Sequence, residues 1–401
     1  MGIAGKSIVI FGAGKIGRSF VGQLFSRSGY RVLFVDVDKR VIEELNRRKS
    51  YDIVVKAEKE EVISVANVGG ILAFDLEPVV EAIAGCSLMA TCVGKNALPK
   101  IMQAIAKGIE KRYQENPGYP LDIILAENVR DACSLVKEYL TALLPKEFPV
   151  DSYLGLIETS IGKMVPIMPK EIENADPLLV YAEPYNTLIL DKNGFRNPIP
   201  LVSGLSPKEN IKAWVDRKAF IHNLGHAVAA YYGSYKYPGK RYLYEVLDDP
   251  DVKEYTKQVM HQSATILEAL YPGDFTMKDL EAHISDLLFR FRNIALKDTL
   301  YRVGQDRPRK LGPDDRFVGM IRLAQQQGMA CGKILEAMAY AFCFKSTDET
   351  GNRSSDDLLF DDILSQGVEV PLLNVCGFDP QEDQELIDEF IRYYNKICIK
   401  D

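Results

Sequence analysis

A glycine-rich motif lies near the amino terminus. Gly12-Ala13-Gly14-Lys15-Ile16-Gly17 follows a short apolar run at 7–11 and precedes an apolar-periodic stretch. Between a strand and a helix, this G-x-G-x-x-G spacing is typical of a dinucleotide site, because its glycines permit a tight turn, close approach of a pyrophosphate and close helix packing. The motif therefore predicts that Gly12, Gly14, Lys15, Ile16 and Gly17 bind a dinucleotide.

An acidic residue follows the motif at the end of the next apolar run. Asp36 stands at the usual distance of about 20 residues, where a carboxylate accepts both hydroxyls of the adenosine ribose. Because that carboxylate repels a 2′-phosphate, Asp36 favours NAD over NADP, and nearby Arg40 keeps NADP as a weaker alternative. Val93 and Gly94 follow a later strand candidate, so they are expected where the nicotinamide half passes.

A nicotinamide enzyme also needs a group that takes the alcohol proton while hydride leaves carbon. The helical pattern around 218–226 offers Lys218, Asn223 and His226. At about 100° per residue, Asn223 lies roughly 140° and His226 roughly 80° around the axis from Lys218, so the three share one arc. In a dry cleft beside a positive nicotinamide, the lysine has a lowered pKa and is a usable base. Without a dinucleotide domain, the trio fits a solvated lysine, a buried amide and a core histidine.

Two further features concern the same site. Asn128 follows the strand candidate 121–126, where it either orients a substrate oxygen or is an ordinary loop asparagine. His222 and His226 have the spacing of a helical metal pair, but Asn223 stands where the zinc-protease motif has glutamate. No third ligand is evident, so we expect no metal.

Positive charge is concentrated at 307–316 in a chain with a net charge of -7. Arg309, Lys310 and Arg316 are candidates for clamping a carboxylate or phosphate of the substrate, because arginine forks suit both groups. The alternative is an exposed loop whose charges serve solubility.

Two kinds of element must position these residues. Strand candidates at 7–11, 31–35, 88–93, 121–126 and 153–157 alternate with helical patterns at 16–28, 41–48, 98–113 and 129–144. This alternation predicts an α/β Rossmann domain with a mainly parallel sheet over 1–200. Long helical patterns then follow at 211–232, 252–271, 277–288, 317–326, 331–344 and 383–397. They predict a mainly α-helical substrate domain over 201–401.

Composition excludes several classes of protein. The 401 residues carry 49 Lys and Arg against 56 Asp and Glu, which disfavours a nucleic-acid partner. No apolar run approaches the roughly 18 residues of a membrane span. The seven cysteines are scattered without a C-x-x-C pair. They fit free thiols in a reducing cytoplasm better than a disulfide framework.

Together these residues resemble a known family, the polyol-specific long-chain dehydrogenases of the mannitol dehydrogenase family. The matching residues are Phe11-Gly-Ala-Gly-Lys-Ile-Gly-Arg18, Asp36, Ala126-Glu-Asn128, Lys218-x-x-x-x-Asn223-x-x-His226-Ala-Val-Ala-Ala-Tyr231, Asn293-x-x-Leu296-Lys-Asp298, Arg302-Val-Gly and Arg309-Lys310-Leu-x-x-x-Asp315-Arg316. The resemblance implies a metal-independent, NAD-dependent enzyme that interconverts a sugar alcohol, mannitol 1-phosphate as the first expectation, and its ketose, fructose 6-phosphate.

The resemblance also implies residue roles. Lys218 is the general base, Asn223 and Asn128 stabilise the oxyanion, and His226 positions the substrate. One departure concerns the substrate: Gly162-Lys163 stands where relatives usually carry Asp-Arg.

Three alternatives remain from the sequence. One is a uronate or other sugar-acid reductase of the same family. Another is a β-hydroxyacid dehydrogenase of the 6-phosphogluconate type, which also pairs a Rossmann domain with a helical one and uses lysine. The third is a non-catalytic NAD-binding regulator.

Overall fold

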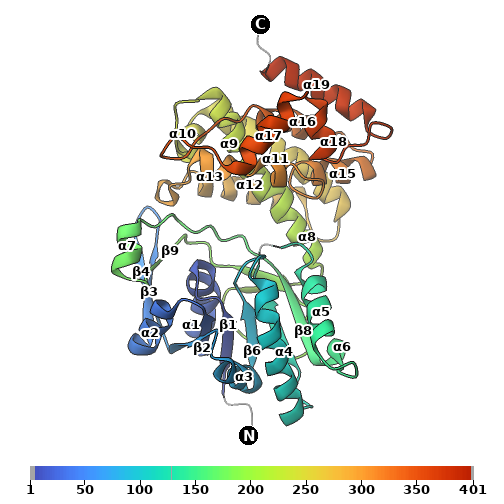
Figure 1. Ribbon diagram of the computed structural model, residues 1–401. Coiled ribbons are helices and arrows are strands. Elements are labelled where there is room, and N and C mark those ends of the chain that lie inside the picture. Colours follow the sequence, from blue (N-terminus) through green and yellow to red (C-terminus); the bar gives the residue numbers. More distant parts are fainter. Residues whose placement is uncertain (1–4, 128, 399–401) are drawn as a thin grey trace. The chain divides into compact units, whose positions relative to one another are not determined.

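The computed structural model describes residues 5–127 and 129–398 (Figure 1). The chain divides into two compact units, Met1–Val215 and Asp216–Asp401. This division falls later than the expected boundary at residue 200, because β11 (Leu205–Lys208) pairs with β10 (Leu188–Asp191) in the sheet of the first unit.

The first unit is built on an eight-stranded sheet of order β11-β10-β8-β7-β6-β1-β2-β5. The strands not yet given are β1 (Ser7–Phe11), β2 (Arg31–Asp36), β5 (Val68–Leu72), β6 (Leu88–Thr91), β7 (Leu121–Leu125) and β8 (Leu154–Ser160). Only the β10–β8 pair is antiparallel among the described strands of this sheet. Strand order reverses between β1 and β6, and ligands of such sheets bind at this reversal, beyond the carboxyl ends of the strands.

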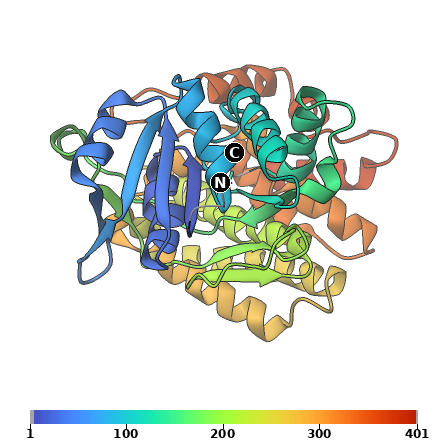
Figure 2. The ribbon, with the colours of Figure 1, turned by 90° about the horizontal axis from the view of Figure 1, so that it is seen from below.

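Apolar side chains on both faces of the sheet form two buried cores. Helices cover both faces of the sheet (Figure 2). Ile8 and Ile10 of β1 belong to one core, and Val9 and Phe11 to the other, as the period of two requires. The first core contains η1 (Gly17–Gly22), α1 (Gln23–Arg27) and α2 (Lys39–Arg48). The second contains α3 (Leu76–Gly85), α4 (Leu98–Glu115) and α5 (Ala132–Leu143), with α6 (Val150–Tyr153) leading into β8. The predicted Rossmann domain is confirmed.

A smaller sheet was not predicted. It has the order β4-β3-β9, from β4 (Glu61–Ala66), β3 (Ser50–Val55) and β9 (Val180–Ala182), the last following α7 (Lys170–Ala175). The sequence analysis also missed β5, β10 and β11. Two glycines obscure the strand pattern of β5, yet Gly70 is needed there, since a Cβ would lie 2.7 Å from Ile42 Cδ1.

The second unit is helical, as predicted, and α9 (Leu224–Lys236) packs against several of its helices. The run from Ala227 to Tyr231 has no exposed surface. The helix α8 (Ile211–Arg217) spans the boundary between the units. The other elements of the second unit are η2 (Lys218–Asn223), α10 (Leu243–Leu247), α11 (Pro250–Leu270), α12 (Met277–Phe291), η3 (Ile294–Leu296), α13 (Leu300–Gly304), α14 (Arg307–Lys310), α15 (Val318–Gln326), α16 (Gly332–Phe342), α17 (Ser355–Ser365), α18 (Glu369–Asn374) and α19 (Gln384–Cys398). Within 5–127 and 129–398, no helix is both long and apolar enough to cross a membrane.

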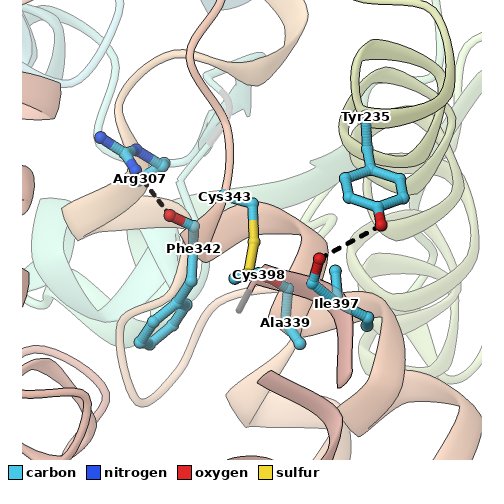
Figure 3. The surroundings of a disulfide bond; sticks show 7 residues. All are labelled: Tyr235, Arg307, Ala339, Phe342, Cys343, Ile397 and Cys398. Carbon is cyan, nitrogen blue, oxygen red and sulfur yellow. Dashed lines mark hydrogen bonds between the residues drawn. A yellow bond between two sulfur atoms is a disulfide. The ribbon is translucent and has the colours of Figure 1, made fainter. Parts of the chain in front are cut away.

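A disulfide joins Cys343, just after α16, to Cys398 at the end of α19 (Figure 3). Their Cα atoms lie 6.0 Å apart, and beside them Tyr235 donates a hydrogen bond to the carbonyl of Ile397 (3.1 Å). The expectation of seven free thiols is therefore wrong for this pair, while the other five cysteines are free. The pairing has no sequence motif, because it depends on the packing of two helices whose cysteines are 55 residues apart.

We predict that Cys343→Ser lowers the free energy of unfolding by about 3–5 kcal/mol under oxidising conditions, because the unfolded chain loses a cross-link. Urea denaturation with and without a thiol reductant measures this. Cys331→Ser, which removes a free buried thiol, is the control and should not alter the effect of the reductant. A wild-type unfolding midpoint that is unchanged by the reductant contradicts the prediction.

Candidate functional site

The glycine loop lies at the carboxyl end of β1, and packing explains two of its glycines. Gly12 has a φ of +100°, and a Cβ there would lie 2.6 Å from the carbonyl oxygen of Cys92. A Cβ on Gly17 would overlap the carbonyl oxygen of Gly12. Gly14 differs, since a Cβ there meets no atom within 4 Å. The loop therefore has open space beside Gly14, which fits close approach of a pyrophosphate.

Asp36 closes the same loop from the end of β2. Its two carboxylate oxygens accept hydrogen bonds from the backbone N–H groups of Ala13 (2.6 Å) and Asp38 (2.9 Å). The structure thus brings the predicted ribose-binding carboxylate to the glycine motif. Arg40 donates to the carbonyl of Asn174, and Lys15 pairs with Glu173 (3.0 Å). Both partners lie in α7, so this helix holds both cations.

Residues after β6 complete this edge of the sheet. The N–H of Val93 donates to Glu127 (3.1 Å), whose other oxygen accepts from the hydroxyl of Thr91 (2.7 Å). Gly94 has a φ of +81°. Glu127 is buried, and desolvation raises the pKa of its carboxyl. This role of Glu127 was not predicted, because no residue spacing in the sequence indicates it. Asn128 lies outside the described residues.

Lys218 and Asn223 begin and end a six-residue π-helical segment, η2. In it the N–H of Leu224 donates to the carbonyl of Ala219, five residues back. The separation of roughly 140° expected from an α-helix is therefore wrong. Because π hydrogen bonds span five residues, Lys218 and Asn223 lie one turn apart on the same side of the helix.

The charges around η2 favour a neutral amine at Lys218. Burial, together with the nearby positive charge of Arg316, lowers the pKa of Lys218 to about 8, against a smaller opposing effect of Asp315. Arg316 donates to the carbonyl of Asn223 (3.2 Å) and to the carboxylate of Asp315 (2.7 Å). A lysine with this pKa can exchange a proton near neutral pH.

His226 follows on the same continuous helix and is held by two neighbours. Its Nε2 lies 3.2 Å from Oδ2 of Asp298, and its ring stacks on Phe291 with centroids 4.7 Å apart. Burial, followed by the charge of Arg302, holds the pKa of His226 well below its usual value. A neutral ring that donates from Nε2 to Asp298 presents Nδ1 as an acceptor. Asp298 and its ion-pair partner Arg302 lie in matching family motifs, but the sequence analysis assigned them no role.

The three predicted substrate-binding cations have different surroundings. Arg316 is the one that donates to the carbonyl of Asn223. Arg309 has a side chain 55% exposed and pairs with Asp306 and Asp315. Lys310 is buried and donates to the carbonyl oxygens of Val303 (2.6 Å) and Gln305, at the end of α13. Burial, with the charges of Arg316 and Arg309, lowers the pKa of Lys310 to about 7.

Neighbouring Arg307 is also buried and forms ion pairs with Asp357 (3.0 Å) and Asp361 (2.7 Å). Three of the four cations of 307–316, Arg307, Lys310 and Arg316, are therefore buried, which differs from an exposed solubility loop.

Two other expectations concern Lys163 and a metal. The buried Lys163 ammonium donates to the carbonyls of Tyr185 (2.8 Å) and Glu183 (3.3 Å) and to Asn186 Oδ1 (3.2 Å). It thereby ties 183–186 to the segment after β8.

Among the described residues, no group of three or more His, Cys, Asp or Glu side chains could hold a metal ion.

Two family models match most of the chain. The mannitol dehydrogenase Rossmann domain matches residues 6–204, and the mannitol dehydrogenase C-terminal domain matches residues 210–388. A mannitol-1-phosphate 5-dehydrogenase of Streptococcus mutans is 35% identical over 348 residues, which cover 86% of this chain and 89% of that protein.

Two solved structures share the fold. The ternary complex of Pseudomonas fluorescens mannitol 2-dehydrogenase with NAD and D-mannitol has a TM-score of 0.75 at 16% identity, covering 98% of this chain and 91% of that one. A substrate-free D-sorbitol dehydrogenase has a TM-score of 0.79 at 17% identity, covering 98% and 94%. From the family models and the 35% identity, we conclude that the chain belongs to the mannitol dehydrogenase family.

Proposed function

We propose that the protein is a metal-independent, NAD-dependent dehydrogenase that interconverts mannitol 1-phosphate and fructose 6-phosphate. The main support is the pairing of a partly buried lysine of lowered pKa with an asparagine one π turn away. The 35% identity to a mannitol-1-phosphate 5-dehydrogenase supports the substrate. NAD bound to a mannitol 2-dehydrogenase of the same fold supports the cofactor.

In this proposal the glycine loop holds the pyrophosphate, and Asp36 accepts the hydroxyls of the adenosine ribose. Asp36 already accepts two backbone hydrogen bonds, and a carboxylate has lone pairs for more. Its negative charge opposes a third phosphate, which favours NAD over NADP. When bound, the nicotinamide accepts hydride from the carbinol carbon.

Residues of the second unit transfer the hydroxyl proton and bind the reacting oxygen. Neutral Lys218 takes the hydroxyl proton, and the Asn223 amide donates to the oxygen as negative charge develops there. Asn128 is proposed as the second donor. His226 accepts a hydrogen bond from a neighbouring substrate hydroxyl through Nδ1. In the reverse direction, protonated Lys218 returns the proton to the carbonyl oxygen.

The proposal is tested by assaying mannitol 1-phosphate, mannitol, sorbitol and a uronate with NAD and with NADP. We expect the highest kcat/KM for mannitol 1-phosphate with NAD. A preference for the uronate supports the sugar-acid reductase instead. Absence of turnover with every substrate overturns the enzymatic proposal.

Two glycine variants separate cofactor contact from packing. Gly14→Ala adds a methyl group into open space, so it should weaken NAD binding at unchanged stability. Gly17→Ala forces the loop to shift, and we expect it also to cost about 1–3 kcal/mol of stability. Calorimetric NAD titration and urea denaturation measure both effects. Unchanged NAD affinity in Gly14→Ala argues against the proposed pyrophosphate position.

We predict that Lys218→Ala loses most of kcat while NAD affinity stays within twofold, roughly, because the base acts on substrate. In the wild type, oxidation should rise as pH passes through about 8, where Lys218 loses its proton, and then level off. Reduction should fall over the same range. Lys236→Ala, which removes a partly exposed, ion-paired lysine on α9, is the control. Near-wild-type kcat in Lys218→Ala across pH 6–10 refutes the assignment.

We predict that Arg309→Ala lowers kcat/KM for mannitol 1-phosphate roughly ten- to a hundredfold, because a charge-assisted contact to phosphate is lost. Activity on mannitol should change little. Arg241→Ala, which removes another half-exposed, ion-paired arginine of the second unit, is the control. Equal losses on both substrates mean that Arg309 orders the segment and does not recognise phosphate.

A further inference from the structure

The π-helical segment η2 packs against α11, and one contact between them is unusual. The hydroxyl of Ser263, on α11, donates a hydrogen bond to the backbone carbonyl of Phe220 at 2.6 Å. Phe220 lies within η2, between Lys218 and Asn223. Ser263 has no exposed surface, so water does not compete for its hydroxyl.

Close packing brings α11 to this carbonyl. Gly225, two residues after the end of η2 on the same helix, has no side chain, and a Cβ there would lie 2.5 Å from the sulfur of Met260. Met260 lies one turn before Ser263 on α11, so both face the same part of the neighbouring helix. The glycine thus lets α11 come near enough for Ser263 to reach the Phe220 carbonyl.

A side-chain donor that enters a helix changes its hydrogen-bond ladder, and such insertions accompany local widening or bending. The Ser263 hydroxyl also lies 3.0 Å from the sulfur of Met320, but it has one proton and a carbonyl oxygen is the stronger acceptor. The bond to Phe220 therefore favours the π arrangement over an α-helical ladder.

We propose that Ser263 is a positioning residue that holds η2 in its π conformation and so keeps Lys218 and Asn223 on one side of the helix. This inference rests on the proposed function of Lys218 as the base. Without the Ser263 bond, an α-helical ladder would place Asn223 roughly 140° around the axis from Lys218. The same change in the ladder would displace Lys218 from its partly buried position.

The test compares two variants of α11. Ser263→Ala removes the hydroxyl that reaches η2. Thr256→Val is the matched control, because Thr256 is also fully buried on α11 and its hydroxyl donates to a backbone carbonyl, that of Val252 in its own helix (2.8 Å). Both variants lose one buried hydrogen bond, but only Ser263→Ala loses one made to η2.

We expect Ser263→Ala to lower kcat for polyol oxidation roughly ten- to a hundredfold, as misplacement of a reacting group by about 1 Å can do. The KM for NAD should not change. The pH midpoint of oxidation should move above about 8, because Lys218 becomes less buried and its pKa rises. Hydrogen–deuterium exchange should become faster in the peptide covering 218–224. Thr256→Val should show none of these changes.

Two results overturn the inference. One is a Ser263→Ala enzyme with wild-type kcat and pH midpoint; the other is a Thr256→Val enzyme with the same losses as Ser263→Ala. If the wild type oxidises no polyol, the proposed function fails instead. Hydrogen exchange still decides whether Ser263 holds η2, since unchanged exchange at 218–224 in Ser263→Ala rules that out.

Discussion

The widening of one buried helix at Lys218–Asn223 is the constraint on which the proposed chemistry depends. A lysine and an amide five residues apart do not share a face in an α-helix, but they do in a π turn. The helix lies among neighbours that bury it, with α11 in contact through Met260 and Ser263. Burial has a second effect at this point, since it lowers the pKa of Lys218. Packing thus sets both the position of Lys218 on the helix and its proton affinity.

The segment 307–316 serves this helix as well. Arg316 reaches the carbonyl of Asn223 and adds the positive charge that lowers the pKa of Lys218 further. Lys310 holds carbonyls at the end of α13, and Arg307 anchors the segment to α17 through Asp357. Most of these cations are buried with a protein partner, and Arg309 is the exposed one. The cluster therefore shapes the surroundings of Lys218.

Local patterns in the sequence predicted much of the fold. The short apolar runs on either side of the glycine motif and the long amphipathic helices after residue 250 carry their own signal, as does Asp36 at the end of β2. Features set by tertiary packing were missed. The π turn has no periodicity of its own, and the Cys343–Cys398 pair is created where α16 and α19 meet. Glu127 holds the loop after β6 and Asp298 holds the His226 ring through hydrogen bonds that residue spacing does not reveal.

We propose that Lys218 is a base whose pKa is lowered by its packing. Its pKa can be measured directly by NMR titration of the protein after reductive ¹³C-methylation of lysines, with the Lys218 signal assigned by its loss in Lys218→Arg. The account predicts a midpoint of about 8, well below the exposed lysines. A Lys218 signal that titrates together with the exposed lysines, near 10.4, would contradict it.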